Sequence, residues 1–113
     1  MARAATTTDV FNAIAEPRRR AILDALAAGE RPVGELVDAV GLAQPQVSKH
    51  LRVLREVGAV SVRELGRQRL YRVNGPALRP VHDWIRDYEQ LWSDRFDALD
   101  DVLDDLKREG AAP

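Results

Sequence analysis

The feature that most constrains this chain is a pair of short amphipathic runs separated by a glycine. In residues 43–54, AQPQVSKHLRVL, the apolar residues Val47, Leu51 and Leu54 recur at i, i+4 and i+7, which predicts a helix with one buried face. The preceding run, VGELVDAVGL, has a similar stripe, and its Gly41 can adopt the left-handed conformation that ends a helix. Two helices joined by a short glycine-containing turn form a helix-turn-helix pattern.

The outer face of the second predicted helix carries amide, hydroxyl and basic side chains and no acidic one. These groups hydrogen-bond base edges and phosphates. An ordinary helical hairpin with a solvated face would show the same stripes, so this run alone leaves both interpretations open. The helix also begins weakly, because Ala43 or Gln44 must cap it and neither residue caps well. The polar residues of the outer face are Gln44, Gln46, Ser48, Lys49 and Arg52.

The residues that follow Gly58 alternate in the manner of two strands. Two alternating runs flank Gly66-Arg67, which predicts a β-hairpin over residues 60–73. An isolated two-stranded hairpin is only marginally stable in water, so this one should pack on the helices. A basic hairpin directly after such a helix is typical of a DNA-contacting wing, although arginines that serve solubility would look the same. The polar residues at its tip and flanks are Arg63, Arg67, Gln68, Arg69 and Arg72.

Two more helices are predicted ahead of the pair. Thr8 or Asp9 can cap the first of them, and Glu16-Pro17 suits the start of the second. Three arginines, residues 18–20, follow that start, and we favour solubility over phosphate contact as their role. Residues 29–32, GERP, should form a loop. The apolar members of the first helix are Val10, Phe11 and Ile14.

The charges of the chain are segregated along its length. The net charge is −1, but residues 1–74 hold 12 basic and 8 acidic side chains, whereas residues 75–113 hold 5 and 10. Residues 43–74 alone hold 7 basic and 2 acidic side chains. A basic centre with an acidic tail is compatible with a nucleic-acid partner for the centre.

Composition excludes several classes of protein. With 45% hydrophobic and 31% charged residues in 113, the chain should form one globular domain. It has no cysteine, no phosphate-binding glycine loop and no Ser/His/Asp set, so we expect neither an enzyme nor a cofactor. No apolar run approaches the ~20 residues of a membrane span, and no signal-peptide core is present, so we expect a cytoplasmic protein without membrane contact.

A long amphipathic helix is predicted at the end of the chain. From Val81 onward the apolar residues recur at an average step close to 3.6. A domain of this size cannot easily cover so long a stripe, which implies a partner surface, although folding back on the domain is the alternative. The candidate interface residues of this stripe are Trp84, Tyr88, Leu91, Trp92, Phe96 and Leu99.

With these elements in place, the chain resembles the arsenic-repressor-type (ArsR/SmtB-like) winged-helix transcription regulators. The matching strings are VFNAIAEPRRRAILDAL, VGELVDAVGLAQPQVSKHLRVLREVGAV and GRQRLYRV, and the resemblance covers about residues 9–75. It implies a homodimer that binds imperfect inverted repeats in promoters and usually represses. It also implies that Arg67 and Arg69 act from the wing, and that the last helix pairs with its twofold mate, helped by Val10, Phe11 and Ile14. The residues that it places toward the major groove are Gln44, Gln46, Ser48, Lys49 and Arg52.

The resemblance and the patterns together define the expected organisation. We expect a mainly α fold with a small β-hairpin, a winged helix-turn-helix that dimerises through its first and last helices. A flexible N-terminus (1–8) should precede the DNA-binding domain (9–75), and the dimerisation helix (76–108) of the same domain should precede a flexible tail (109–113). The expected partners are double-stranded operator DNA and a second copy, and the inducer is unknown.

Family members often release DNA on binding a metal, through cysteines of the first helix of the pair or through histidines and carboxylates of the last helix. The first set is absent here, and the last helix offers only His82 with Asp83 and Asp87. One histidine cannot form a paired-histidine site, so we expect no metal site. Three alternatives stay open: a small molecule in the aromatic dimer seam, a protein-interaction module that does not read DNA, and a non-specific DNA binder, which should be more basic.

Overall fold

The computed structural model describes residues 9–111, with the side chains of all of these except Phe96 and residues 109–111. The chain divides into two compact units, one within residues 1–81 and one within residues 82–113. The predicted flexible N-terminus, residues 1–8, lies outside the described residues, as do residues 112–113.

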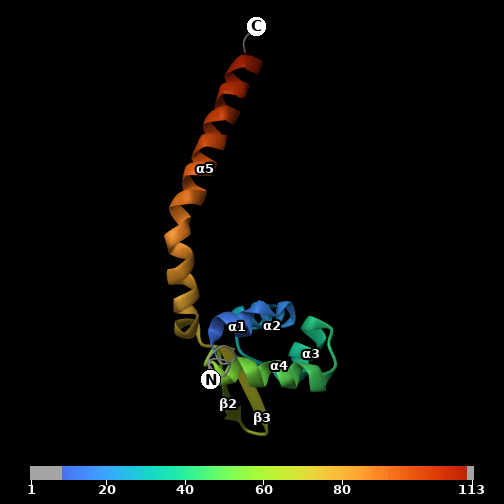
Figure 1. Cartoon of the computed structure of the whole chain (residues 1–113). Helices are drawn as coiled ribbons and strands as arrows, with labels where there is room; N and C mark the ends of the chain where they lie inside the picture. The colour runs from blue at the N-terminus through green and yellow to red at the C-terminus, as the bar shows by residue number, and fades with distance from the viewer. Residues whose placement is uncertain (1–8, 112–113) are drawn as a thin grey trace. The chain divides into compact units, whose positions relative to one another are not determined.

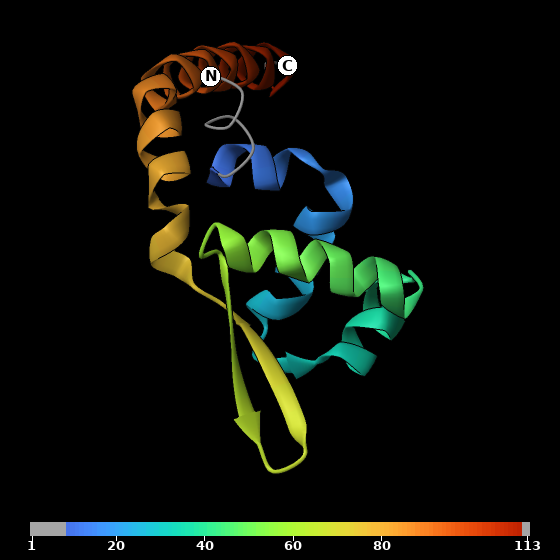
Figure 2. The ribbon, with the colours of Figure 1, turned by 60° about the horizontal axis from the view of Figure 1, so that its bottom comes forward.

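The described part of the first unit combines helices with an antiparallel sheet whose strand order is β1-β3-β2 (Figures 1 and 2). The sheet's two long strands form a hairpin that extends away from the helices (Figure 2). The elements in chain order are α1 (Val10–Ala15), α2 (Pro17–Ala27), β1 (Arg31–Pro32), α3 (Val33–Val40), α4 (Gln44–Glu56), β2 (Val60–Leu65), β3 (Gln68–Val73), the 3-10 turn η2 (Gly75–Leu78) and α5 (Arg79–Ala111).

Local chemistry explains where α1 and α2 begin. The Asp9 carboxylate accepts a hydrogen bond from the Asn12 N–H at 2.7 Å, which caps α1 as predicted. Glu16 caps α2 by accepting from the Arg18 N–H at 3.0 Å, and Pro17 takes the first helical position. The hydrogen bond from the Arg18 backbone is the main reason that the pKa of Glu16 is lowered.

Glycines make the two sharpest turns that matter for the site. Gly41 has φ 69° and its N–H donates to the Val37 carbonyl, so it ends α3 in the predicted left-handed conformation. Leu65 pairs with Gln68, which leaves Gly66 and Arg67 as a two-residue hairpin loop. Gly66 has φ 63° at the first loop position, where a type II′ turn requires glycine.

The core of the first unit lies beneath α4 and joins the helices to the sheet. The three apolar residues of the predicted stripe, Val47, Leu51 and Leu54, are at most 1% exposed. Complete burial of such a side chain stabilises the fold by about 1.5–3 kcal/mol. The other buried members of the core are Ala13, Ile22, Leu26, Leu36, Ala59, Val60 and Tyr71.

The segment predicted as a loop at residues 29–32 contains a strand. Arg31 and Pro32 pair with Tyr71 and Leu70 of β3, which makes β3 the central strand of the sheet. Leu70 and Tyr71 are both buried although adjacent residues of a strand point to opposite faces, so both faces of β3 are covered here. Proline is tolerated at this position because β1 is an edge strand.

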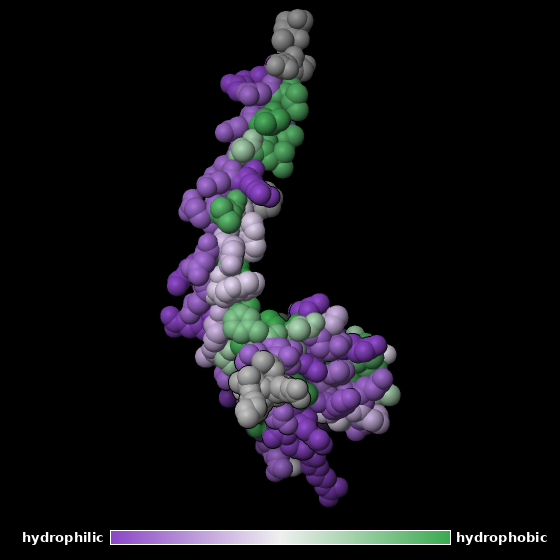
Figure 3. Space-filling view, in the orientation of Figure 1, coloured by the Kyte–Doolittle hydropathy of each residue, from purple (hydrophilic) through white to green (hydrophobic). Residues whose placement is uncertain are grey.

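Helix α5 starts within the predicted dimerisation helix (76–108) and ends later than predicted. Its first residue, Arg79, precedes Val81, where the predicted apolar repeat begins, because Pro80 is tolerated in a first helical turn. It runs to Ala111, through residues 109–111 of the predicted flexible tail. Hydrophilic side chains gather along one side of α5 and apolar ones along another toward its end (Figure 3). Within the described residues, no helix combines the length and the apolarity that a membrane span requires.

Candidate nucleic-acid interface

Burial of the apolar stripe of α4 fixes which of its side chains reach the surface. With Val47 and Leu51 in the core, the polar face of the helix points outward. All five residues predicted for DNA contact on this helix are exposed: Gln44, Gln46, Ser48, Lys49 and Arg52.

A hollow of about 420 Å³ lies between the beginning of α4 and the β2–β3 hairpin, which we call the wing. It brings together five predicted residues from distant parts of the chain, in a strongly hydrophilic region (Figure 3). Arg69 lies over the Tyr71 ring with its guanidinium carbon 5.9 Å from the ring centroid, which orients its donors. The predicted residues that line this groove are Gln44, Ser48, Arg67, Gln68 and Arg69, and the others are Pro32, Val33 and Tyr71.

The side chains of the groove can bind a polymer that has both negatively charged phosphates and bases with hydrogen-bonding edges. The wing supplies two guanidinium groups and an amide, and α4 supplies an amide and a hydroxyl. Guanidinium groups bind phosphate oxygens, whereas glutamine and serine can bond base edges as well.

Two of the residues predicted for DNA contact have partners within the chain. The Gln46 side-chain oxygen accepts from the Ala43 N–H at 3.2 Å, so it closes the first turn of α4. Since alanine has no side-chain acceptor, only this half of a capping box exists. Arg63 donates to both carboxylate oxygens of Glu30, at 3.1 and 3.0 Å from its Nε. This contact raises the pKa of Arg63 and lowers that of Glu30, and it neutralises the charge of Arg63.

Comparison with known proteins places this arrangement in a family. The sequence pattern described as "Bacterial regulatory protein, arsR family" matches residues 16–62, from the cap of α2 into β2. A probable mercury resistance operon repressor of Streptomyces lividans is 38% identical over 95 residues, which cover 84% of this chain and 74% of that protein. The chain belongs to the arsR family of bacterial regulatory proteins.

Further similarities agree with this assignment. The transcriptional repressor SdpR of Bacillus subtilis (strain 168) is 30% identical over 80 residues, or 71% of this chain and 89% of that protein. The homodimeric winged helix-turn-helix DNA-binding domain Mb0332 of Mycobacterium bovis superposes with a TM-score of 0.59 at 32% identity, covering 72% of this chain and 78% of that domain. The predicted fold and the resemblance are therefore confirmed, and a family of transcription regulators is not one of enzymes.

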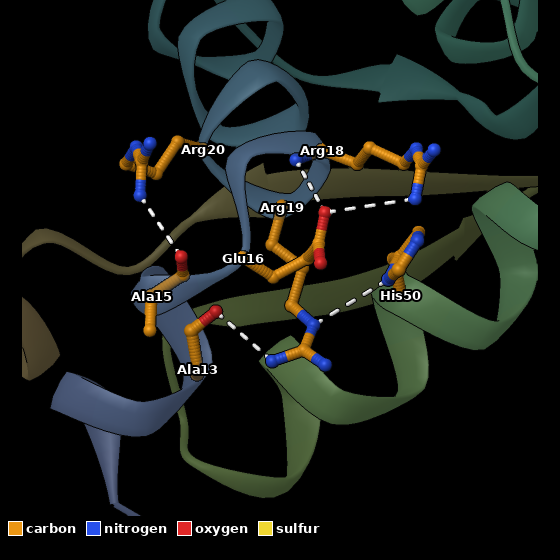
Figure 4. Close-up of polar contacts among 7 residues, drawn as sticks. All are labelled: Ala13, Ala15, Glu16, Arg18, Arg19, Arg20 and His50. Atoms are coloured by element: carbon orange, nitrogen blue, oxygen red, sulfur yellow. Dashed lines mark hydrogen bonds and ion pairs between the residues drawn. The ribbon is translucent and has the colours of Figure 1, made fainter.

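Two of the three consecutive arginines of this arsR-family chain have a role that sequence reasoning missed (Figure 4). Arg20 donates to the carbonyls of Ile14 and Ala15 at 2.8 and 3.2 Å, and Arg19 donates to that of Ala13 at 3.1 Å. These carbonyls lie at the end of α1, where a helix has no internal donors for them. The sequence signal was the arginine run directly after a six-residue helix, which we interpreted as solubility.

The interface residues predicted for a second copy differ in exposure. Trp84, Tyr88, Leu91, Trp92 and Leu99 are 43–59% exposed, and Phe11 is 41% exposed. Ile14 is partly buried, and Val10 is only 7% exposed in the single chain, so Val10 can contribute little area to a contact with a second copy. The side chain of Phe96 lies outside the described part. This interface remains a prediction for the arsR-family chain.

The candidate metal ligands of α5 form only a pair. His82 Nδ1 lies 3.5 Å from a carboxylate oxygen of Asp83. Among residues 9–111, no three side chains of His, Cys, Asp or Glu come together as potential ligands. The expectation that this chain has no metal site stays a prediction.

Proposed function

We propose that this chain is a cytoplasmic, sequence-specific transcriptional repressor that binds an inverted-repeat operator as a homodimer. The observation that carries the proposal is the groove in which Gln44 and Ser48 of α4 face the wing residues Arg67, Gln68 and Arg69. Membership of the arsR family and the repressors among its relatives support the same function.

The groove divides DNA recognition between its two walls. Helix α4 enters the major groove, where the Gln44 amide can pair with an adenine and Ser48 can bond a base or a phosphate. Arg67 and Arg69 hold backbone phosphates from the wing, and Lys49 and Arg52 add positive charge beside them. In a twofold dimer, two α4 helices about 34 Å apart reach successive major grooves, and a bound dimer blocks polymerase.

Two substitutions should separate the roles of the two walls. Arg67→Ala should weaken binding to all duplexes and reduce the slope of log affinity against log salt by about 1, because one phosphate contact is lost. Gln44→Ala should relax the preference at one base pair, worth about 1–3 kcal/mol, with less effect on random DNA. Fluorescence anisotropy with duplexes selected from a random pool measures both effects. Arg95→Ala, on α5, is the matched control, and equal losses on selected and random DNA for both groove variants would contradict these roles.

Soft metals should not act as inducers of this chain. The Streptomyces relative is named for mercury resistance, but this sequence has no cysteine, and thiolates are the ligands that soft metals prefer. We expect the affinity for a selected duplex to stay unchanged when stoichiometric Hg²⁺, Zn²⁺ or arsenite is added. Tight metal binding that releases the DNA would refute this expectation.

A further inference from the structure

Arg19 of α2 connects two other helices (Figure 4). Its terminal nitrogen donates to the carbonyl of Ala13, at the end of α1, at 3.1 Å. Its Nε donates to Nδ1 of His50, in the middle of α4, at 3.4 Å. The planar guanidinium can serve both helices at once because its donors have a fixed fork geometry.

The contact with α4 depends on the protonation state of His50. To accept from Arg19, Nδ1 must carry a lone pair, so the ring is neutral with its proton on Nε2. The charged groups that face His50 are Arg18, Arg19 and Glu16 of α2 and Lys49 of α4, whereas α1 presents only backbone carbonyls to Arg19. Partial burial first, and then Arg19, lower the pKa of His50, while Glu16 opposes them.

We propose that Arg19 is a positioning residue for DNA binding, which fixes α4 against the end of α1 through His50 and does so only while His50 is neutral. The inference rests on the proposed function. His50 follows the groove residue Ser48 by two positions on α4, so a shift of α4 at His50 displaces that wall of the groove. Because α1 carries Phe11 of the proposed dimer surface, the same link sets the position of α4 relative to the partner copy.

If Arg19 positions α4 through His50, lowering the pH should weaken DNA binding, whereas the added positive charge alone would strengthen it. A protonated His50 adds a positive charge next to Lys49, which by itself would strengthen binding to DNA. It also replaces the hydrogen bond to Arg19 by a repulsion between two cations, which frees α4 from α1. Weaker binding at low pH would therefore indicate positioning, and stronger binding would indicate charge alone.

The first measurement follows the affinity of the full chain for a duplex that it selects from a random pool at pH 7.5. At constant ionic strength, the wild-type affinity should fall about fivefold between pH 7.5 and the pH at which the NMR signals of the His50 ring show it protonated, the effect of one hydrogen bond. His50→Asn places a non-titrating Oδ1 where Nδ1 stands, so it should bind as wild type at pH 7.5 and lose the pH dependence. His50→Ala has no acceptor and should bind weakly at both pH values.

A pair of arginine variants separates positioning from charge and from helix capping. Arg19→Lys keeps the charge but loses the fork, so it should bind DNA about fivefold more weakly at pH 7.5 and lack the pH dependence. Arg20→Lys is the matched control, because Arg20 donates to the carbonyls of Ile14 and Ala15 at the end of α1 and so tests helix capping apart from the link to His50. Circular dichroism checks that each variant is folded. If an arginine variant is unfolded, the dependence of DNA affinity on pH in the wild type and in His50→Asn still tests whether the link positions α4.

Three results would overturn the inference. Wild-type affinity that is unchanged or higher once the His50 ring is protonated excludes the link as a determinant of binding, as does a His50→Asn profile that matches the wild type. If Arg19→Lys binds DNA as tightly as the wild type, the fork geometry of the Arg19 guanidinium is not required for binding. These outcomes leave the proposed function standing, whereas failure of the wild type to select any duplex at pH 7.5 overturns the function and the inference together.

Discussion

At the scale of the residue, side-chain type alone does not separate a DNA contact from a structural contact. Gln46 and Arg63 have suitable chemistry for DNA, but Gln46 closes the first turn of α4 and Arg63 is paired with Glu30. Gln44 and Arg69, of the same two residue types, line the groove. The difference lies in what the fold places beside each side chain, which no local sequence pattern records.

The incomplete cap of α4 yields a prediction about stability. Ala43→Ser adds a side-chain acceptor for the N–H of Gln46, which in the present chain donates to the Ala43 carbonyl at 3.0 Å. Such a cap is worth about 1 kcal/mol, and Ala43 already has the extended conformation of an N-cap. The melting temperature should rise by about 4–8 °C in thermal unfolding followed by circular dichroism. Thr8→Ala, outside α4, serves as a control, and an unchanged or lower melting temperature for Ala43→Ser would argue against this cap.

His50 should also make stability depend on pH. Because the pKa of His50 is lowered in the folded chain, the unfolded chain binds more protons between that pKa and the ordinary value of about 6.5. Stability is therefore fully present above about pH 6.5 and declines as the pH falls toward the folded pKa. The melting temperature of the wild type should decline more steeply than that of His50→Asn between pH 7 and 5.5. Parallel declines would mean that another group is responsible.

At the level of helices and strands, a repeating apolar pattern predicts an element when contacts between residues close in sequence determine that element. The stripes of α3 and α4 and the alternation around Gly66 identify these elements because burial follows the helical and strand periods. Strand β1 was missed because its two residues are a strand only through pairing with β3, far along the chain. The groove follows from the same cause, since it exists only when the wing lies next to α4.

The pairing of Arg63 predicts that the arginines of the wing are not equivalent. Arg63→Ala should reduce the salt slope of DNA binding much less than Arg67→Ala, because Glu30 already neutralises Arg63. Salt titrations of the two variants on one selected duplex provide the comparison. An equal reduction of the slope would mean that Arg63 leaves Glu30 and binds a phosphate in the complex.

At the scale of the whole molecule, the account requires a second copy to cover the apolar stripe of α5. Trp92 is 50% exposed and central to the proposed surface, so Trp92→Asp should convert a dimer to a monomer in sedimentation velocity. Ser93→Asp introduces the same charge at the neighbouring exposed position of α5 and should leave the dimer intact. A dimeric Trp92→Asp would place the interface elsewhere, and a monomeric wild type would contradict the proposed dimer itself.

The central claim is that the chain distinguishes one DNA sequence from others. Its most direct test is a binding titration of the wild type against the DNA immediately upstream of its own gene and against a scrambled duplex of equal length, each at two salt concentrations. We expect the wild type to bind the upstream DNA at least about a hundredfold more tightly than the scrambled duplex, with affinity that falls as salt rises. Equal affinity for both duplexes, with both lost together at higher salt, would contradict sequence-specific recognition of this site.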